Sequence, residues 1–262
     1  MGRFKAIMAV TPKGKITSTG TENKRDLGGI TNKCIATTEA GQKVMVKASY
    51  SENGGEVVAE RVAYVLGWKM GLHVNEVQII DFAEKLGLRT KWASVHTWNN
   101  NFNAVIYCGK RDVTDSTWKL NQLDRAKLAM DMFDWIIQND DRHGGNWGYD
   151  VEKGHLYLID NGFGRPWQDW VTPNSLSDIS VRLTTALAKI NIHSTARSSD
   201  ILVNAVRWFL ALNDHDIRQI TDLPAELEEM YGKGIRTRIV ACQQALRTVI
   251  LRESNRANRA AD

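Results

Sequence analysis

The feature that most constrains this chain is an amphipathic stretch that ends in a polar loop and leads to a short apolar strand. Apolar residues recur at intervals of three and four from Leu123 to Ile137, which predicts a helix with one buried face. Residues 139–146 are polar and glycine-bearing, so they end the helix as a loop. Leu156–Ile159 then forms an apolar strand that stops at Asp160. An aspartate followed by Asn-Gly at a strand end is expected to point its carboxylate into a cleft.

The spacing of polar residues in these segments is that of the catalytic loop and metal-binding turn of kinases. Asp141 and Asn146 lie five residues apart, and Asp160 follows fourteen residues later. Phosphoryl transfer needs a carboxylate beside the attacking hydroxyl and oxygen ligands for Mg²⁺. Asp140 competes with Asp141 for the first role, and the five-residue step to Asn146 favours Asp141. The alternative for Asp141 is a turn residue in a polar loop.

A lysine at the end of another apolar strand supplies a complementary cation. Lys47 ends the run Val44–Lys47, and Glu56 opens the next predicted helix. Paired, they would hold the ammonium against nucleotide phosphates, at a partly solvent-accessible place in the cleft. The alternative for Lys47 is a solvated lysine at a strand end. The alternative partner is Glu60, one helical turn after Glu56.

Three segments resemble the HipA-like kinases and their relatives among phosphatidylinositol-kinase-like proteins. They read GEVVAERVAYVLGWKMGLHVNEVQII, DWIIQNDDRHGGNWGYD and LYLIDNGFGR. In that group a Glu opens a helix ending in Leu-Gly, the loop reads Asn-x-Asp-x-His-x-x-Asn, and the turn reads Ile-Asp-x-Gly. The resemblance assigns Asp141 as the catalytic Asp, Asn146 and Asp160 as metal ligands, and Lys47 with Glu56 as the ion pair.

The chain also departs from the protein-kinase pattern. Its turn is Asp-Asn-Gly rather than Asp-Phe-Gly, and no Ala-Pro-Glu follows. No GxGxxG loop precedes Lys47. The segment containing Gly28, Gly29 and Lys33 resembles the glycine-containing, lysine-terminated nucleotide loop of HipA-like proteins, where backbone N–H groups approach phosphate.

The resemblance implies a kinase that uses ATP and Mg²⁺ to phosphorylate a hydroxyl, most simply a Ser or Thr of a protein substrate, itself included. Transfer to a small molecule or lipid headgroup by the same fold is the first alternative. A pseudokinase acting as a binding module is the second, and the complete Lys, Glu, Asp, Asn, Asp set argues against it. A metal-dependent hydrolase needs more His and Asp ligands than the six histidines supply in any clear pattern. HipA-like kinases include toxins paired with antitoxins, but nothing in the sequence indicates an antitoxin-like or regulatory partner.

The composition of the chain indicates its cellular compartment and the classes of partner it can bind. The net charge of +4 permits a phosphate-bearing ligand but is not the footprint of a specific nucleic-acid binder. No stretch approaches the roughly 20 apolar residues of a membrane span. Cys34, Cys108 and Cys242 are far apart and odd in number, which indicates a reducing compartment. We therefore expect a cytoplasmic protein without a membrane partner.

The order of predicted elements favours an α+β, two-lobed protein-kinase-like fold. Residues 1–110 would form a β-rich, nucleotide-binding small lobe with one helix, and residues 111–262 a helical lobe with the catalytic loop and metal turn. The boundary is expected at Gly109–Asp115. The predicted elements of the small lobe are a hairpin of Cys34–Thr38 and Lys43–Lys47, a helix over Glu56–Leu66 capped by Gly67, and strands at Val74–Phe82 and Asn103–Cys108. The helical lobe should hold helices near 178–190, 199–212, 214–220 and 233–253.

Overall fold

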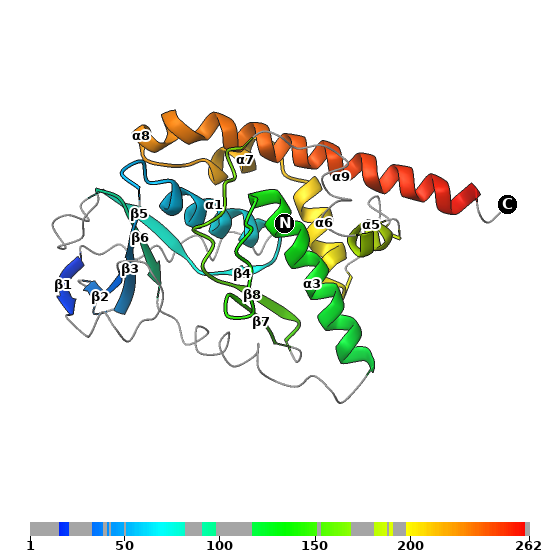
Figure 1. Ribbon diagram of the computed structural model, residues 1–262, viewed down its shortest axis with the longest axis horizontal. Helices are drawn as coiled ribbons and strands as arrows, with labels where there is room; N and C mark the ends of the chain where they lie inside the picture. Colours follow the sequence, from blue (N-terminus) through cyan, green and yellow to red (C-terminus); the bar gives the residue numbers. More distant parts are fainter. Residues whose placement is uncertain are drawn as a thin grey trace.

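The computed structural model shows a small β-sheet beside a larger helical part, which confirms the two-lobed α+β prediction (Figure 1). It describes residues 16–20, 33–38, 41, 43–49, 51–81, 91–97, 117–150, 153–168, 181–187, 189–190 and 198–259. The expected boundary at Gly109–Asp115 and the expected strand at Asn103–Cys108 lie outside these residues. The division into lobes at residue 110 therefore stays a prediction.

The larger sheet has five strands in the order β1-β2-β3-β6-β5, and every pairing is antiparallel. The predicted hairpin is present, with Lys33 opposite Lys47 in its register. Within the predicted stretch 74–82 the chain forms β4 and, after a break, β5. The strand β6 had not been predicted. The bounds are β1 Ile16–Gly20, β2 Lys33–Thr38, β3 Lys43–Ala48, β4 His73–Val74, β5 Val77–Ile80 and β6 Ala93–Thr97.

The strand β3 is buried on both faces, and its two faces serve different purposes. Val44, Val46 and Ala48 join a small apolar cluster with Ala36 of β2 and two residues of β6. Because side chains alternate along a strand, Lys47 lies on the opposite face. Ser94 of β6 is the cross-strand partner of Lys47, so the two share that face.

The helix α1, Gly55–Lys69, is longer than predicted, and Gly67 is not its cap. The helix ends at Met70, where Gly71, with φ of +75°, forms a Schellman motif: its N–H and that of Leu72 donate to the carbonyls of Trp68 and Gly67. Gly67 is needed instead for close packing, because a Cβ there would lie 2.3 Å from Cγ2 of Val74. This absent side chain lets β4 pass directly against α1.

The apolar face of α1 belongs to the main hydrophobic core rather than to the small cluster of the sheet. Val58, Val62 and Leu66 are fully buried with Phe133 of α3, Thr117–Ile137. The predicted stripe of α3 is confirmed, since its members from Ala126 to Ile137 are buried and Leu123 packs at the edge. The helix that carries the small lobe's carboxylates is thus fixed to the helical part of the molecule.

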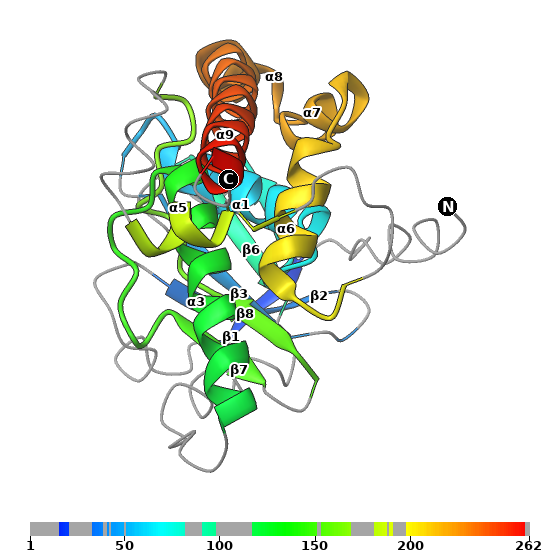
Figure 2. The ribbon, with the colours of Figure 1, turned by 90° about the vertical axis from the view of Figure 1, so that its right-hand side faces the viewer.

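The remaining elements complete the helical part. A three-stranded sheet of order β4-β8-β7 contains β7 Trp147–Asp150 and β8 His155–Leu158. The predicted C-terminal helices are present as α5 Val181–Leu187, α6 Ile201–Leu210, α7 Asp214–Ile220 and α9 Lys233–Arg259, with the short α8 Ala225–Leu227 and the π-helix η2 Glu228–Gly232 before α9. The long α9 packs on α3, α5, α6 and α7 (Figure 2).

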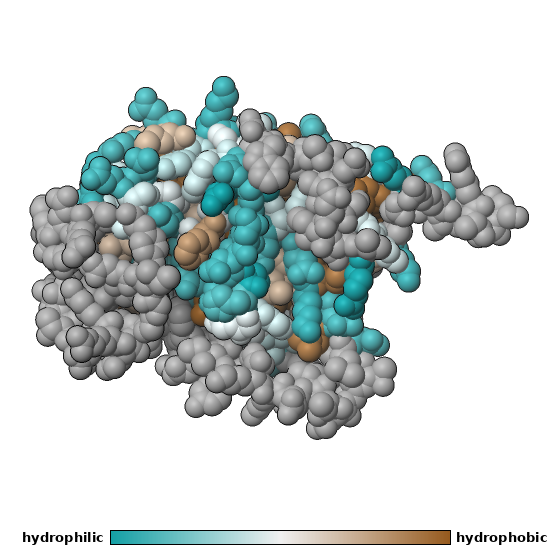
Figure 3. All heavy atoms as spheres, in the orientation of Figure 1, coloured by the Kyte–Doolittle hydropathy of each residue, from teal (hydrophilic) through white to brown (hydrophobic). Residues whose placement is uncertain are grey.

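One face of the molecule, as far as the described residues form it, is mostly polar. Figure 3 shows hydrophilic side chains over much of the visible face, with apolar ones scattered among them. Among the helices of the described part, none is long and apolar enough to cross a membrane.

Candidate active site

The centre of the candidate site is Lys47, held between two carboxylates from distant parts of the chain. Its Nζ lies 2.9 Å from Oε1 of Glu60 on α1 and 2.9 Å from Oδ1 of Asp160 after β8. The strand β3 supplies the cation, α1 one anion and the strand-end turn the other. The structure therefore brings Lys47 together with the turn that carries Asp160, a contact that the sequence analysis had not predicted.

The expected pairing of Lys47 with Glu56 is corrected to Glu60. Glu56 lies at the very start of α1, where its Oε2 accepts hydrogen bonds from Ser51, at 3.0 Å, and from Ser49. Glu60 lies one turn further along α1 and is buried. Glu56 therefore fastens the loop between β3 and α1, while Glu60 reaches the lysine.

The Lys47–Glu60 pair is buried, not partly solvent-accessible as the sequence had indicated. The residue exposures are 6% for Lys47 and 3% for Glu60. Burial alone would lower the pKa of Lys47, but the carboxylates of Glu60 and Asp160 outweigh it and raise that pKa above its ordinary value. The lysine is therefore a fixed positive charge at neutral pH. Of the two carboxylates, only that of Asp160 has substantial solvent exposure, 39% of its side chain.

The polar loop after α3 places Asp141 and Asn146 differently with respect to solvent. The loop begins at Gln138, whose φ of +52° turns the chain out of the helix. The backbone N–H of Asp141 donates to Oδ1 of Asn139, and Nδ2 of Asn146 donates to the carbonyl of Asp141 at 3.3 Å. Asp141 is exposed and Asn146 is buried. Asp141 can therefore meet an incoming group. Asn146 is fixed inside the loop, where its Oδ1 is an oxygen that can coordinate a metal ion.

The turn after β8, Ile159–Gly162, has an unusual backbone. Asp160 has a φ of +56°, the left-handed region that residues with a side chain rarely adopt. Two hydrogen bonds hold the turn, from the N–H of Asn161 to Oε2 of Glu60 at 3.1 Å and from the N–H of Ile159 to the carbonyl of Asn146 at 3.0 Å. Glu60 therefore binds both Lys47 and the turn that carries Asp160. Such strain, held by several partners, is common at functional sites.

Arg142 is a site residue to which the sequence analysis gave no role. Its guanidinium forms a two-point ion pair with Asp134 of α3, at 2.8 and 2.9 Å. It also donates to the carbonyls of Asn146 and Ile159, both at 2.8 Å, and to Oδ1 of Asn161 at 2.6 Å. A sequence signal existed, because a lone aspartate on the otherwise apolar last turn of a buried helix needs a cation.

The structure places little of the predicted nucleotide loop. Gly28 and Gly29 lie outside the described residues, and Lys33 is placed only by its backbone, at the start of β2. His143 accepts a hydrogen bond from the N–H of Gly145, which fits a role in shaping the loop. Trp167 packs on Tyr231, with ring centroids 4.6 Å apart.

The donors at this site suit Mg²⁺. A partly exposed carboxylate on Asp160 and an amide oxygen on Asn146 are the hard oxygen ligands that Mg²⁺ prefers, and it commonly takes few of them from protein. Within the residues that the structure describes, no three His, Cys, Asp or Glu side chains gather to hold a metal by themselves. An ion here would complete its shell with phosphate or water oxygens.

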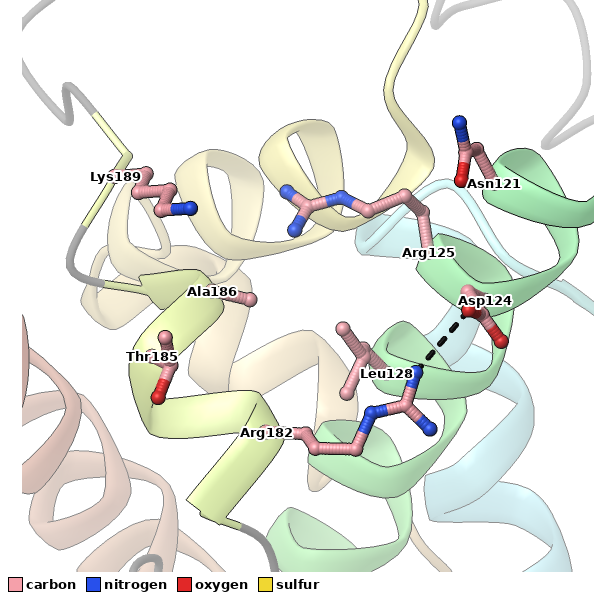
Figure 4. A pocket seen from close by; sticks show the side chains of 8 residues that line it. All are labelled: Asn121, Asp124, Arg125, Leu128, Arg182, Thr185, Ala186 and Lys189. Carbon is pink, nitrogen blue, oxygen red and sulfur yellow. Dashed lines mark hydrogen bonds and ion pairs between the residues drawn. The ribbon is translucent and has the colours of Figure 1, made fainter. Parts of the chain in front are cut away.

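A separate pocket of about 420 Å³ lies between α3 and α5 (Figure 4). Its two arginines are already paired, Arg182 with Asp124 and Arg125 with Asp200. None of the residues discussed above lines it, so we do not include it in the candidate site.

The chain is similar to known kinases in sequence and in fold. A family model described as HipA-like kinase matches residues 23–162. The crystal structure of the Helicobacter pylori proinflammatory kinase CtkA superposes with a TM-score of 0.52 at 15% identity, covering 87% of this chain and 95% of that one. A Golgi casein kinase has a TM-score of 0.40 at 12% identity, covering 92% of this chain and 71% of its own. Among curated proteins, no relative matches the chain significantly.

Proposed function

Because the chain belongs to the HipA-like kinase family, we propose that it transfers the γ-phosphoryl group of ATP to a hydroxyl group, with a serine or threonine of a protein as the acceptor. The observation that carries this proposal is the buried Lys47 held between Glu60 and Asp160. A fixed ammonium beside a partly exposed carboxylate is what a site needs to grip a metal-bound polyphosphate. This function rests on the family and on that geometry together.

We assign the phosphate-binding roles as follows. Lys47 contacts the nucleotide phosphates, and Glu60 fixes the position of its ammonium. Asp160 and Asn146 would hold Mg²⁺, which would offset the charge of the phosphates. The segment of Gly28, Gly29 and Lys33 is proposed to approach the phosphates from the small lobe, as the family resemblance implies.

Asp141 receives the acceptor. Its exposed carboxylate lies in the same loop as Asn146, joined to it by the bond from Nδ2 of Asn146 to the Asp141 carbonyl. We propose that Asp141 orients the acceptor hydroxyl and takes its proton as the phosphoryl group transfers. The catalytic contribution is positioning and charge stabilisation, as expected for a loose transition state.

The experiment is an ATP-consumption assay with and without Mg²⁺, followed by mass spectrometry of the protein itself and of a cell lysate. The expected result is Mg²⁺-dependent consumption, with new phosphoserine or phosphothreonine. Phosphate appearing only on small molecules or lipid headgroups would replace the protein acceptor by the alternative. If the wild-type protein binds ATP without consuming it, the protein is a binding module rather than a kinase.

Two neighbouring aspartates give a matched control for this assay. Asp141→Ala should keep nucleotide binding and lose transfer, because its carboxylate meets the acceptor rather than the phosphates. Asp140 is adjacent and also exposed, but the five-residue step to Asn146 favours Asp141 as the catalytic residue, so Asp140→Ala should remain active. The reverse outcome would shift the catalytic assignment by one residue.

A further inference from the structure

The guanidinium of Arg142 joins three parts of the candidate site from behind. Through its polar contacts it connects the last turn of α3, the catalytic loop and the turn that carries Asp160. We propose that Arg142 is a positioning residue, which through Asn161 and the carbonyl of Ile159 fixes the turn so that Asp160 presents its carboxylate to the metal. As far as the metal is concerned, this inference rests on the proposed function.

The geometry favours positioning over a contact with substrate. The Arg142 side chain is 6% exposed and that of Asp134 is 11% exposed, so the pair lies inside the protein. An arginine presents its donors in a rigid planar fork, so a pair anchored on Asp134 through Nε and Nη2 fixes the directions of the remaining N–H groups. Of these, one on Nη1 donates to the carbonyl just before Asp160, and one on Nη2 donates to the side chain just after it.

The turn needs such an anchor because its backbone is strained. Asp160 has a positive φ, and a strained residue persists only where its surroundings hold it. In protein kinases whose turn is Asp-Phe-Gly, packing of the Phe sets the position of the aspartate. In this chain Asn161 stands at that place, is 1% exposed, and is held through its Oδ1 by Arg142. In this chain the hydrogen bond from Arg142 to Asn161 therefore takes the role that packing of the Phe has in those kinases.

Arg238 on α9 provides a control that separates positioning from stability. It is also buried, at 3% exposure, and it donates to the carbonyls of Trp135, Ile136 and Gln168. It thus supports the end of α3 as Arg142 does, but none of these hydrogen bonds reaches the turn or the catalytic loop. A change at Arg238 should alter stability without altering how the site holds a metal.

The test uses substitutions at Asn161, because they leave the Arg142–Asp134 pair intact and the variants should fold. Asn161→Ala removes the acceptor of Arg142, whereas Asn161→Asp retains an oxygen at the same place. Two quantities are measured for each variant and for Arg238→Met: the Mg²⁺ concentration that half-saturates binding of a non-hydrolysable ATP analogue, and the hydrogen exchange of the Ile159 and Asn161 amides.

We expect Asn161→Ala to raise the Mg²⁺ half-saturation about tenfold or more, the usual range when a residue supporting a metal ligand is lost. The two amides should exchange faster in the same variant. Asn161→Asp should recover most of the loss in Mg²⁺ affinity. Arg238→Met should lower the melting temperature and leave the half-saturation within about twofold of the wild type.

The outcomes separate this proposal from the proposed function. If the wild type binds the analogue with Mg²⁺ and Asn161→Ala has an unchanged half-saturation, Arg142 has no positioning role, even if the amides exchange faster. If the wild type shows no Mg²⁺-dependent binding, the proposed function fails, and amide exchange alone decides whether Arg142 holds the turn. Unchanged exchange in Asn161→Ala would then overturn the proposal, and faster exchange would support it.

Discussion

The turn at Asp160 is held from two sides by two ion pairs that differ in what they face. On the cleft side, Lys47 joins Glu60 and the partly exposed Asp160. On the inner side, Arg142 joins Asp134 and main-chain carbonyls. Both cations are buried, yet only Lys47 contacts a carboxylate that solvent or a ligand can reach. Burial of a charged side chain therefore does not by itself identify a catalytic residue. A better indication is whether one of its partners is exposed to solvent or to a ligand.

The contrast also explains how the cleft pair is kept in place. Glu60 accepts hydrogen bonds from Lys47 and from the N–H of Asn161, so it ties the lysine to the same turn that Arg142 holds from the other side. The helix that carries Glu60 is in turn packed into the main core. We therefore infer that the residues on the cleft side take part in phosphoryl transfer, whereas those on the inner side hold the turn in position.

The largest expected effect comes from Asp160→Asn, which removes the partly exposed carboxylate that contacts Lys47 on the cleft side. An amide offsets the charge of a metal-bound triphosphate far less well, and losing one preorganised electrostatic group typically costs about 3 kcal/mol of barrier or more. Mg²⁺-dependent turnover should fall at least a hundredfold with the circular dichroism spectrum unchanged. Near-normal transfer by this variant would remove Asp160 from the mechanism.

Lys47→Met should damage both activity and stability. Removing one partner of a buried pair leaves an uncompensated charge, which typically costs about 3–5 kcal/mol, so the free energy of unfolding should drop measurably in denaturant titrations. The control is Lys91→Met, because Lys91 pairs with Glu226 at the exposed surface. That variant should change the free energy of unfolding by less than about 1 kcal/mol. Equal losses in the two variants would contradict the buried character of the Lys47 pair.

The two glutamates of α1 give a smaller and more specific effect. Glu60→Gln should weaken use of Mg²⁺–ATP, because Lys47 keeps its charge and loses its tether. Glu56→Gln should weaken it much less, since Glu56 contacts Ser49 and Ser51 rather than the lysine. Steady-state kinetics on both variants will rank them. A stronger defect in Glu56→Gln would restore the pairing that the sequence alone had favoured.

The smallest expected effect is the contribution of His73, which lies outside both pairs, to the dependence of stability on pH. Burial and the nearby His155 lower the pKa of His73 to about 4, below its ordinary value of 6.5. The unfolded state therefore binds more protons between these values, so stability should rise as pH increases from about 4 to about 6.5. Because the His73 ring is partly exposed, solvent screening should keep the gain below about 1 kcal/mol. Thermal melts of His73→Gln should show a flatter profile across this window, and an identical slope would exclude His73 as its source.

Much of this arrangement could be predicted from sequence, because it depends on local order along the chain. The stripe from Ala126 to Ile137, the polar loop and the strand ending at Asp160 follow from periodicity and composition. The same reasoning placed Lys47 at a strand end. Their meeting in the structure reflects the kinase-like order of these elements.

What sequence missed depends on packing between distant elements. Glu56 and Glu60 lie one turn apart on α1, so which of them meets Lys47 depends only on how α1 packs relative to the strand that carries the lysine. Gly67 had the signature of a cap, but the close approach of Val74 is what requires it. Arg238 supports the end of α3 from about a hundred residues away, and no local pattern marks it.

The most direct test of the central claim is calorimetric binding of Mg²⁺–ATP, with phosphoryl transfer measured on the same samples of wild type, Asp160→Asn and Asp141→Ala. We predict that Asp160→Asn loses Mg²⁺-dependent binding, whereas Asp141→Ala binds like the wild type and loses transfer. Loss of binding in folded Asp141→Ala, or wild-type binding and transfer in Asp160→Asn, would contradict the roles assigned to the cleft.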